Sequence, residues 1–539
     1  MTLLHTAKLS MDMTRVLTDI ELSGIKIDTA ALKELKDSYT SRIEELLEVL
    51  NLAAKKAMGD TPVNLDSPAD RSLLFYSRKV NDKKRWASLF NIGTTMNERG
   101  SRKKKKRTEF NRGDFSRTYQ SNTTQVYKTT ASKCTLCDGF GKTSKRKKDG
   151  TYSKVRYICK RCSGCGIIYT NDLETAGFSL KPLTALDCTA HGFKTDSTTL
   201  NNYLTSDISS TAKAYIRAYC EYSSIKTYLR TFVEGIERAV TKKDFIHPNF
   251  MQCVTATGRL SSRSPNFQNM PRANTFPVRK TIISRWPDGF ILEGDYKQLE
   301  FRVAGFLSDD STVYKEVEEG FDVHNFTAKM MDVTRQEAKA HTFKPLYGGV
   351  SGTDKQRNYY RAFKRKYTGI THWHDALAEE AIARKKITLP SGREYLFPNV
   401  RRTRWGGVTS GTSIKNYPVQ GFATADLLPI ALVYTSKLLQ ENKMQSVICN
   451  TVHDSIVLDV HPEEKDLAID ILSKSMLSLF DECKKRYNII YSMPIGIELK
   501  IGKNWLDLEP ILELEWKPET SKEYKYEPTN SSEREPRFI

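Results

Sequence analysis

A pattern of cysteines and glycines that occurs twice constrains the fold of this chain more than any other feature. The pattern C-x-x-C-x-G-x-G covers residues 134–141 and again residues 159–166. Paired C-x-x-C knuckles offer four thiolates for tetrahedral zinc, and the glycines permit the tight turns that aim backbone N–H groups at sulfur. A disulfide cluster is the alternative, which a reducing compartment disfavours. We predict one structural Zn²⁺ with the ligands Cys134, Cys137, Cys159 and Cys162, and with Cys165 as a spare or alternate ligand.

The two knuckles lie in a segment whose charge sets it apart from the rest of the chain. Residues 95–170 contain 20 Lys and Arg against 5 Asp and Glu, so they carry +15 of the total net charge of +20. The segment is polar and interrupts stretches of helical periodicity. Such a positive excess indicates a polyanionic partner, most often nucleic acid. We predict a small zinc-binding insertion that holds DNA, with a protein-binding site as the alternative.

The knuckle pattern resembles the DnaJ-type zinc module, although only over residues 134–166. This resemblance concerns the metal site and implies no chaperone function.

The rest of the 539 residues has the composition of a protein with several packed units, since 39% of all residues are apolar. No apolar stretch reaches the ~18 residues of a membrane span, and the start lacks a secretory signal. We therefore expect a cytoplasmic protein with no membrane partner. Helical spacing of apolar residues covers 12–58, with a break at Gly24, and returns over 197–240. Ser67 and Pro68 are expected to cap and open a helix that continues to Val80.

Two short apolar segments, each predicted to be a strand or a hairpin, carry an aspartate at the end or in the turn. The run from Phe290 to Leu292 precedes Asp295, at the expected exit of a strand. A predicted hairpin, formed by residues 447–449 and 456–460, carries His453 and Asp454 in its connection. Two carboxylates on neighbouring strand ends can bind two divalent cations ~3.5–4 Å apart, which activate an attacking hydroxyl and stabilise a leaving phosphate. Taken alone, each aspartate is weak evidence, because solvated aspartates at strand ends are common.

A helix is predicted to begin near Val333. Steps of four residues place Arg335, Lys339, Phe343 and Tyr347 along one slowly drifting stripe of that helix. The two cations suit triphosphate oxygens, and the two aromatic rings suit a base or a sugar. An amphipathic helix with a charged edge is the alternative.

Six segments together resemble the motifs of family A DNA polymerases, the group of bacterial DNA polymerase I and many phage replicases. DYKQLEFR (295–302) and VHDS (452–455) are similar to the two palm motifs, and RQEAKAHTFKPLYG (335–348) resembles the fingers-helix motif. TATGRLSSRSPNFQNMP (255–271), LPSGREYLFP (389–398) and NYPVQG (416–421) resemble segments that contact primer and template. The resemblance covers residues 11–80 and 193–505, and the order of the motifs fits the family.

The resemblance implies an α+β fold of the right-hand polymerase type, with an antiparallel palm sheet, helical fingers, a helical thumb and a small zinc-binding insertion. Residues 1–94 would form N-terminal helices and the first part of the thumb, 95–170 the insertion, and 171–255 the return of the thumb. The palm would take 256–310 and 416–516, and the fingers 311–415. Residues 517–539 are expected to be a disordered tail.

The resemblance also implies roles for single residues. Asp295 and Asp454 would bind two Mg²⁺ with the help of the Tyr296 carbonyl, and Lys339 would protonate the departing pyrophosphate. The nucleotide-binding residues would be Gln298, Glu300, His324, Arg335, Lys339, Phe343 and Tyr347, with Glu300 excluding a ribose 2′-hydroxyl. The primer–template contacts would come from Arg259, Gln268, Asn269, Asn416, Gln420 and His453.

The sequence departs from the family pattern at three positions. Ser455 stands where a glutamate is usual, and Thr412 stands where an arginine is common. Pro345 lies inside the expected fingers helix, where it removes the hydrogen bond to the His341 carbonyl, so a kink is expected there.

The function that follows from the resemblance is template-directed extension of a primer 3′-hydroxyl with dNTPs, for viral or phage replication. The match begins too early for a preceding 3′–5′ exonuclease domain, so proofreading is expected from another chain. That chain, or a processivity or replisome protein, is an expected partner of the insertion, beside primer–template DNA and dNTPs. A single-subunit RNA polymerase or primase-like enzyme and a non-catalytic DNA-binding scaffold are the alternatives.

Overall fold

The computed structural model describes residues 2–80, 94–96, 102–104, 123–183, 188–189, 192–271, 276–349, 354–404 and 406–517. The expected disordered tail from residue 518 onward lies outside the described residues, as do Lys105 and Lys106 in the first lysine run of the insertion. The chain divides into two compact units. The larger unit contains Met1–Lys36 and Arg230–Ile539, and the smaller unit contains Asp37–Leu229.

A five-stranded antiparallel sheet lies at the centre of the larger unit, in the order β19–β20–β16–β21–β22. Its strands are β16 (Phe290–Tyr296), β19 (Val447–Val452), β20 (Ser455–Val460), β21 (Ile495–Gly502) and β22 (Glu509–Trp516). The predicted hairpin is present as β19 and β20. Both strands run longer than expected, so only His453 and Asp454 connect them. β16 also continues past Asp295, which therefore lies within the strand and not at its exit.

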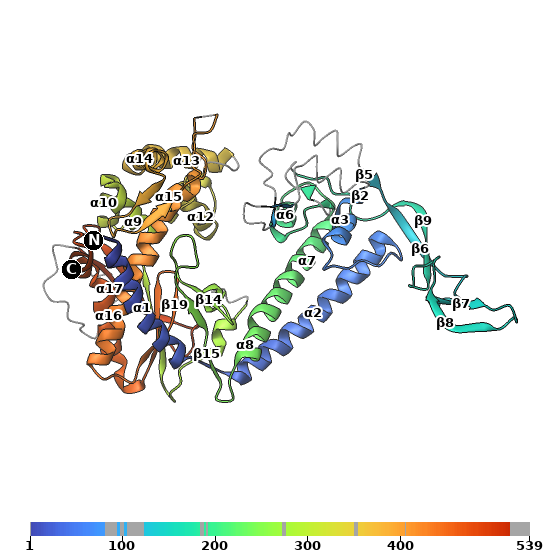
Figure 1. Ribbon diagram of the computed structural model, residues 1–539, viewed down its shortest axis with the longest axis horizontal. Coiled ribbons are helices and arrows are strands. Elements are labelled where there is room, and N and C mark those ends of the chain that lie inside the picture. Colours follow the sequence, from blue (N-terminus) through green and yellow to red (C-terminus); the bar gives the residue numbers. More distant parts are fainter. Residues whose placement is uncertain are drawn as a thin grey trace. The chain divides into compact units, whose positions relative to one another are not determined.

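Helices cover one face of this sheet (Figure 1). α17 (Lys465–Leu477) packs against β16 and β21, and the Tyr296 hydroxyl donates to the Met476 carbonyl at 2.7 Å. α16 (Leu428–Glu441) contacts α17, while α1 (Thr2–Ser23) contacts both α16 and β19. Because neighbouring residues of a strand point to opposite faces, the Asp295 side chain lies on the face away from α17.

The other elements of the larger unit surround the sheet. After β16 come α9 (Leu299–Ser308), α10 (Ser311–Glu318), α11 (Val323–Met331), α12 (Arg335–Thr342), α13 (Asp354–Lys366) and α14 (Thr368–Arg384). The pair β17 (Lys386–Thr388) and β18 (Glu394–Leu396), α15 (Gly411–Gly421), the π-helical η6 (Phe422–Leu427) and α18 (Leu479–Tyr487) follow. Shorter elements are β1 (Ile25–Ile27), the π-helical η3 (Leu229–Val233), α8 (Glu234–Ala239), β12 (Phe245–Ile246), β13 (Asn249–Met251), β14 (Ser261–Arg263), η4 (Phe267–Asn269), η5 (Val278–Thr281), β15 (Ile282–Ile283) and η7 (Pro462–Glu464).

One continuous helical run in the larger unit has the length and hydropathy of a membrane span. This run, Gly411–Glu441, joins α15, η6 and α16, and 78% of its most apolar 18-residue window is buried within the protein. Buried core helices of folded proteins meet the same criterion. The burial of this run beside the sheet is that of a core helix.

The smaller unit is built on helices and a cluster of aromatic rings. α2 (Thr29–Met58), which begins in the larger unit, is joined to α7 (Ser210–Tyr228) by an Arg42–Glu221 ion pair at 2.8 Å. Phe75, which is fully buried, lies 6.0 Å from Phe178 and 5.7 Å from Tyr215 between ring centroids. Further elements are α3 (Pro68–Tyr76), α6 (Ser197–Asn201) and the strand pairs β2 (Arg78–Val80) with β5 (Thr123–Gln125), β3 (Thr94–Met96) with β4 (Arg102–Lys104), and β10 (Cys188–Thr189) with β11 (Gly192–Phe193).

The predicted helix start at Ser67 is confirmed, but the helix is shorter than expected. The Ser67 hydroxyl accepts the Asp70 N–H, and Pro68 occupies the first turn of α3. The helix ends at Tyr76 because Ser77 adopts a left-handed conformation with φ 51°. Residues 78–80, expected to be helical, instead form β2.

Residues 127–175 form a ribbon of two successive strand pairs, called the ribbon below. β6 (Tyr127–Lys133) pairs with β9 (Ile167–Thr175), and β7 (Lys142–Arg146) pairs with β8 (Tyr152–Ile158). The two cysteine knuckles connect the first pair to the second (Figure 1).

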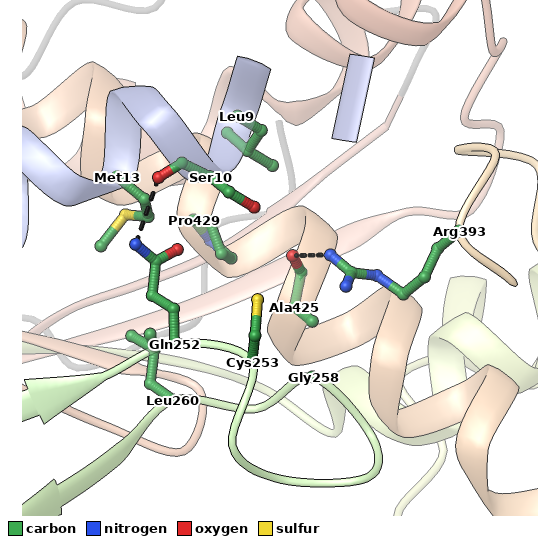
Figure 2. Close-up of a pocket in the computed structure, with 10 residues that line it drawn as sticks. All are labelled: Leu9, Ser10, Met13, Gln252, Cys253, Gly258, Leu260, Arg393, Ala425 and Pro429. Carbon is green, nitrogen blue, oxygen red and sulfur yellow. Dashed lines mark hydrogen bonds between the residues drawn. The ribbon is translucent and has the colours of Figure 1, made fainter. Parts of the chain in front are cut away.

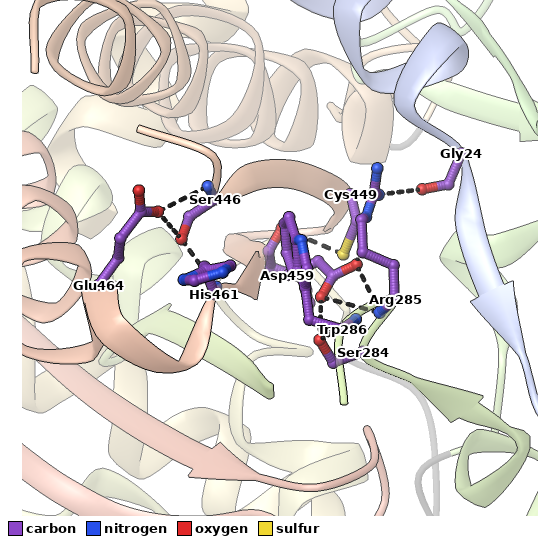
Figure 3. Close-up of polar contacts among 10 residues, drawn as sticks. Gly24, Ser284, Arg285, Trp286, Ser446, Cys449, Asp459, His461 and Glu464 are labelled. Carbon is purple, nitrogen blue, oxygen red and sulfur yellow. Dashed lines mark hydrogen bonds and ion pairs between the residues drawn. The ribbon is translucent and has the colours of Figure 1, made fainter. Parts of the chain in front are cut away.

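A buried ion pair ties the sheet to the start of the chain (Figure 3). The Asp459 carboxylate on β20 accepts Arg285 Nε at 2.7 Å and the Ser284 hydroxyl at 2.6 Å. Arg285 then donates through Nη2 to the Gly24 carbonyl at 3.0 Å, between α1 and β1. Only 2% of the Asp459 side chain is exposed, so the hydrogen bonds and the positive charge of these partners must compensate for the water that its carboxylate loses on burial.

This ion pair predicts a stability difference between two single substitutions. Asp459→Ala leaves Arg285 without its carboxylate in a largely buried position, and we expect the free energy of unfolding of the larger unit to fall by about 3–5 kcal/mol. Glu441→Ala removes the exposed Lys437–Glu441 pair and should cost about 0.5 kcal/mol or less. Urea unfolding followed by tryptophan fluorescence measures both. Equal midpoints for the two variants would contradict the prediction.

Candidate active site

Of the two predicted metal-binding aspartates, Asp295 lies on β16 and Asp454 lies in the turn that leads into the adjacent strand β20. Asp295 on β16 is paired in register with Ser455, the first residue of β20. Asp454 directly precedes Ser455, and its carbonyl accepts the Tyr296 N–H at 3.3 Å. Both carboxylates are half-buried. The register thus brings together the two aspartates that the sequence places 159 positions apart.

A third carboxylate, which the sequence did not reveal, shares the face of the sheet on which Asp295 lies. Glu498 on β21 is paired in register with Asp295, on the side opposite Ser455. Residues directly opposite each other on antiparallel strands point to the same face. The Glu498 side chain is about one-third exposed and forms an ion pair with Lys500 at 2.7 Å. The alternation of apolar and polar residues in IGIELKIG (495–502) indicates on which face of the strand Glu498 lies. Only the register shows that Glu498 is a neighbour of Asp295.

Ser455 takes no part in a carboxylate cluster. Its side chain is fully buried, and its hydroxyl donates to the Val452 carbonyl at 3.0 Å across the two-residue turn. The Thr451 hydroxyl donates back to the Ser455 carbonyl at 2.9 Å. Ser455 therefore stabilises the turn that presents His453 and Asp454, in place of the glutamate that is usual in the family.

Three of the predicted DNA contacts lie at or near this turn. One is in the turn itself, and two are on the short helix η4, which is hydrogen-bonded to β19. His453 is exposed and has a φ of 57°, which directs the turn. Gln268 on η4 donates through Nε2 to the Thr451 carbonyl at 3.3 Å. Asn269, the next residue, is exposed.

Arg259 and Glu300 form an ion pair with each other. Arg259 donates through Nη2 to Glu300 on α9 and through Nε to the Thr424 hydroxyl on η6, at 3.2 Å in the second case. Burial raises the pKa of the Glu300 carboxyl, and the Arg259 guanidinium opposes that rise. Gln298, at the start of α9, has a left-handed backbone, and its carbonyl accepts the Arg302 N–H at 3.1 Å.

A second arginine, Arg393, forms hydrogen bonds to the π-helical segment η6. Arg393 donates through Nη2 to the Asp426 carboxylate at 2.8 Å and to the Ala425 carbonyl at 2.9 Å. Ser391 donates to the same carboxylate at 2.6 Å. Asp426 is fully buried. The segments 255–271, 389–398 and 416–421, which resemble family motifs, thus meet around η6, and π-helical segments are frequent at functional sites.

Gly421 shows how closely these segments approach one another. A Cβ atom at this position would lie 1.6 Å from the Tyr395 hydroxyl oxygen. That hydroxyl donates to the Thr257 carbonyl at 2.8 Å. A larger residue at position 421 would therefore separate the three segments.

A small pocket lies under this junction (Figure 2). It lies between α1, the segment 252–260 and η6, and Arg393 projects toward it. Its volume of about 10 Å³ holds about one water molecule, so it is not a nucleotide site.

Asn416 and Gln420 lie on α15, among the same segments. The Asn416 side-chain oxygen is buried with no hydrogen-bond partner among the described residues. The Gln420 carbonyl accepts the Thr424 hydroxyl at 2.7 Å, so it bridges α15 to η6.

The predicted fingers helix ends earlier than expected. α12 stops at Thr342, and residues 343–348 form turns in which Lys344 N–H donates to the His341 carbonyl at 3.1 Å. The expectation of a long kinked helix was wrong, because the chain leaves the helix before reaching Pro345. Phe343 and Tyr347 are therefore not on a helical stripe with Arg335. The side chain of Lys339, on α12, lies outside what the structure describes.

Aromatic contacts still connect this segment to α9. The ring of Phe343 lies 6.2 Å from that of Phe301, the neighbour of Glu300, and 5.2 Å from that of His324. The Tyr347 hydroxyl is buried with no hydrogen-bond partner among the described residues. Phe343 and Tyr347 both pack against the hydrophobic core of the larger unit.

Arg335 and His324 have partners within the protein. Arg335 Nε donates to the Asp322 carboxylate at 2.8 Å, and His324 Nδ1 lies 3.0 Å from the Thr342 hydroxyl. Asp322 also caps α11 by accepting the N–H groups of His324 and Asn325. Burial opposes ionisation of Asp322, but Arg335 and these N–H groups outweigh it and lower its pKa. The sequence signals Asp322 as a cap, but not as the partner of Arg335.

The four predicted zinc ligands converge in the ribbon. Their sulfur atoms all lie within 4.8 Å of one another, with Cys134–Cys159 at 3.8 Å and Cys137–Cys162 at 3.6 Å. These separations match the roughly 3.8 Å edge of a tetrahedron with Zn–S bonds of about 2.3 Å. They exceed the ~2.05 Å of a disulfide, so the disulfide alternative was wrong for these four residues. Cys165 is exposed and lies outside the cluster.

The two knuckles support each other through their last glycines. Cys134 N–H donates to the Gly166 carbonyl and Cys159 N–H to the Gly141 carbonyl, both at 2.9 Å. Gly141 and Gly166 also donate to the sulfurs of Cys137 and Cys162, at 3.3 and 3.2 Å. Both glycines have a positive φ and sit where a Cβ would lie about 2 Å from the other knuckle's backbone.

Comparison with known proteins identifies the family of the part of the chain that carries the polymerase-like motifs. The sequence model of DNA polymerase family A matches residues 170–507, which is more than half of the chain. DNA polymerase I of Lactococcus lactis subsp. lactis is 31% identical over 311 residues, and that of Synechocystis sp. is 27% identical over 358 residues. These matches cover 53% and 59% of this chain but 34% of each relative, so the chain spans about a third of their length.

A solved structure shares the fold. The POL domain of Pol1 from M. smegmatis, in complex with DNA primer-template and dNTP, matches with a TM-score of 0.60 at 18% identity. The match covers 92% of this chain and 70% of that one. The predicted α+β fold is thereby confirmed, and the chain belongs to DNA polymerase family A.

Proposed function

We propose that this protein is a template-directed DNA polymerase that extends a primer 3′-hydroxyl with dNTPs. The observation that supports the proposal is the pairing of β16 with β20, which sets Asp295 opposite Ser455 and next to the turn that carries Asp454. The solved relative binds primer-template and dNTP, and we propose the same partners here.

The two carboxylates fit the metal ions that this chemistry uses. Asp295 and Asp454 are half-buried carboxylates at adjoining backbone positions, and carboxylate oxygens are the ligands that a hard cation prefers. Two Mg²⁺ ions bound there would activate the primer hydroxyl and stabilise charge on the phosphate oxygens. In this proposal the Tyr296 carbonyl is a further ligand.

The residues around this face would position the substrates. Arg335 and His324 would contact the triphosphate, and Lys339 would donate the proton that the pyrophosphate takes up. Glu300, held in place by Arg259, would lie against the sugar and exclude a 2′-hydroxyl. Such positioning and electrostatic stabilisation supply most of the rate enhancement in phosphoryl transfer.

The alternatives differ in what they incorporate. A single-subunit RNA polymerase or primase-like enzyme would prefer rNTPs, and a scaffold would incorporate neither. The Glu300 carboxylate, which is 20% exposed beside Arg259, supports the DNA polymerase, because a carboxylate placed against the sugar would leave no space for a 2′-hydroxyl. The absence of a 3′–5′ exonuclease activity and a role in phage replication stay predictions.

Primer extension tests the proposal. We expect wild type to extend a labelled primer with dNTPs and Mg²⁺, and Asp454→Asn to lose at least about a hundredfold in rate, because one bridging carboxylate is gone. Asp288→Asn serves as the control, since Asp288 is exposed and precedes β16. No extension by wild type would support the scaffold, and preferential use of rNTPs would support the RNA polymerase.

The Arg335–Asp322 pair predicts an effect on triphosphate binding. Asp322→Asn keeps the helix cap but releases Arg335 from its carboxylate, so we expect inorganic triphosphate to bind about two- to fivefold more tightly. Asp332→Asn removes the neighbouring Asp332–Lys355 pair and should leave the affinity unchanged. Calorimetric titration measures both. Weaker binding in Asp322→Asn would contradict the role of Arg335.

We also propose that the ribbon binds one structural Zn²⁺ through Cys134, Cys137, Cys159 and Cys162. The support is the tetrahedral spacing of the sulfurs and the composition of the ribbon's core. Among the described residues, the buried cluster of the ribbon consists of these four cysteines, with Ile168 packed against them. So small a cluster cannot offset the chain entropy of two strand pairs, and a metal ion can.

The zinc proposal predicts a difference between two cysteine variants. We expect one zinc per chain by elemental analysis in wild type and in Cys165→Ser, whose sulfur lies outside the cluster. Cys162→Ser should lose the zinc, and limited proteolysis should then cut within residues 127–175, where wild type is not cut. A zinc-free wild-type protein with a protease-resistant ribbon would rule out the proposal.

A further inference from the structure

The outer strand pair of the ribbon is exposed on both of its faces. Every residue of β8 except Ser153 is exposed, as are Lys142, Lys145 and Arg146 of β7. The strands nevertheless carry large apolar side chains. Tyr152, Val155, Tyr157 and Ile158 are 68%, 57%, 45% and 66% exposed. Neighbouring residues of a strand point to opposite faces, so Val155 and Tyr157 lie on one face of β8 and Tyr152 and Ile158 on the other. Each face thus exposes a tyrosine ring and an aliphatic side chain.

The charge of this strand pair is strongly positive and is not neutralised within the chain. Residues 142–161 contain nine Lys and Arg against Asp149 alone. Among the described residues no ion pair joins any of these nine cations to a carboxylate, and Asp149 instead accepts the Thr151 hydroxyl and N–H. A surface of this kind attracts a polyanion and releases its counterions.

The register places cations next to the exposed rings. Tyr152 is paired with Arg146, and Tyr157 is paired with Thr143. The Lys145 ammonium lies over the Tyr157 ring, 5.1 Å from its centroid. Tyr157 shares the face of Thr143 and Lys145, whereas Tyr152 shares the face of Ser144 and Arg146, so each face of the strand pair carries one ring beside a cation and a small side chain. Rings flanked by cations can stack on bases while the cations contact the phosphates between them.

We infer that the strand pair β7–β8 is a binding site for single-stranded DNA. The bases of a duplex are stacked inside the helix and present no free face to Tyr152 or Tyr157, whereas every base of a single strand has one. The site lies in the smaller unit and uses no residue of the proposed active site. It is therefore a second nucleic-acid site, beyond the polymerase function.

The zinc cluster gives this site its shape. β7 follows the first knuckle directly, and β8 ends immediately before the second. An isolated strand pair is marginally stable in water, so the metal at its base would hold the rings and cations in place. Loss of zinc should abolish the single-strand binding as well.

Fluorescence anisotropy with labelled dT20 tests the inference on the full chain. An excess of an unlabelled blunt-ended hairpin duplex occupies the duplex sites on the protein and offers no single strand that competes with dT20. We expect the double variant Tyr152→Ala/Tyr157→Ala to bind dT20 at least about fivefold more weakly than wild type, because each ring contributes stacking on a base. Tyr127→Ala, which removes an exposed tyrosine from β6 of the same ribbon, should bind like wild type. Zinc content of one per chain verifies that each variant keeps the ribbon folded.

A second variant separates stacking from charge. Lys145→Gln/Lys147→Gln/Lys148→Gln should reduce the slope of log affinity against log salt by about 0.7 for each phosphate that is no longer neutralised. Ultraviolet cross-linking of dT20 to wild type should map to residues 142–161. Unchanged dT20 affinity in the double tyrosine variant would overturn the inference and point to an acidic protein as the partner. Equal losses of affinity for dT20 and for duplex would overturn it as well, in favour of unspecific attraction.

Discussion

The pairing of β16 with β20 and β21 is the interaction on which the proposed chemistry depends. It places Asp295 opposite Ser455 and Glu498, and beside Asp454. A shift of this register by one residue would turn Asp295 toward α17 and bury it. The register is held from the other face, where Tyr296 bonds to α17, and near the end of β20, where Arg285 bonds Asp459. The apolar face of the sheet thus positions the polar one.

Several motifs could be predicted from the sequence because they depend on local chemistry, whereas the α+β fold class followed from the resemblance to family A polymerases. The β19–β20 hairpin, the helix cap at Ser67 and the convergence of the four cysteines follow from short patterns with a direct physical meaning. The resemblance to family A polymerases supplied the order of the elements. Contacts that depend on register or tertiary packing were not visible, as Glu498 and the Arg335–Asp322 pair show.

The fingers segment shows where local reasoning was insufficient. A spacing of four residues predicts one helical stripe from Arg335 to Tyr347, but α12 ends at Thr342. The proline was expected to bend the helix, and instead the chain stops being helical three residues before it, with Phe343 packed between Phe301 and His324. Aromatic packing against α9 and the conformational limits of proline together outweigh the helical propensity of the sequence.

The position of α1 has a consequence for how the chain folds during synthesis. α1 packs on α16 and β19, and Arg486 on α18 donates to Asp12 at 2.9 Å across 474 residues of sequence. The first helix therefore emerges from the ribosome long before its partners exist, while residues 37–229 form a compact unit of their own. Folding of that intervening unit shortens the flexible loop that α1 must close. The smaller unit would then act, during synthesis, as a preassembled link between the two ends of the larger one.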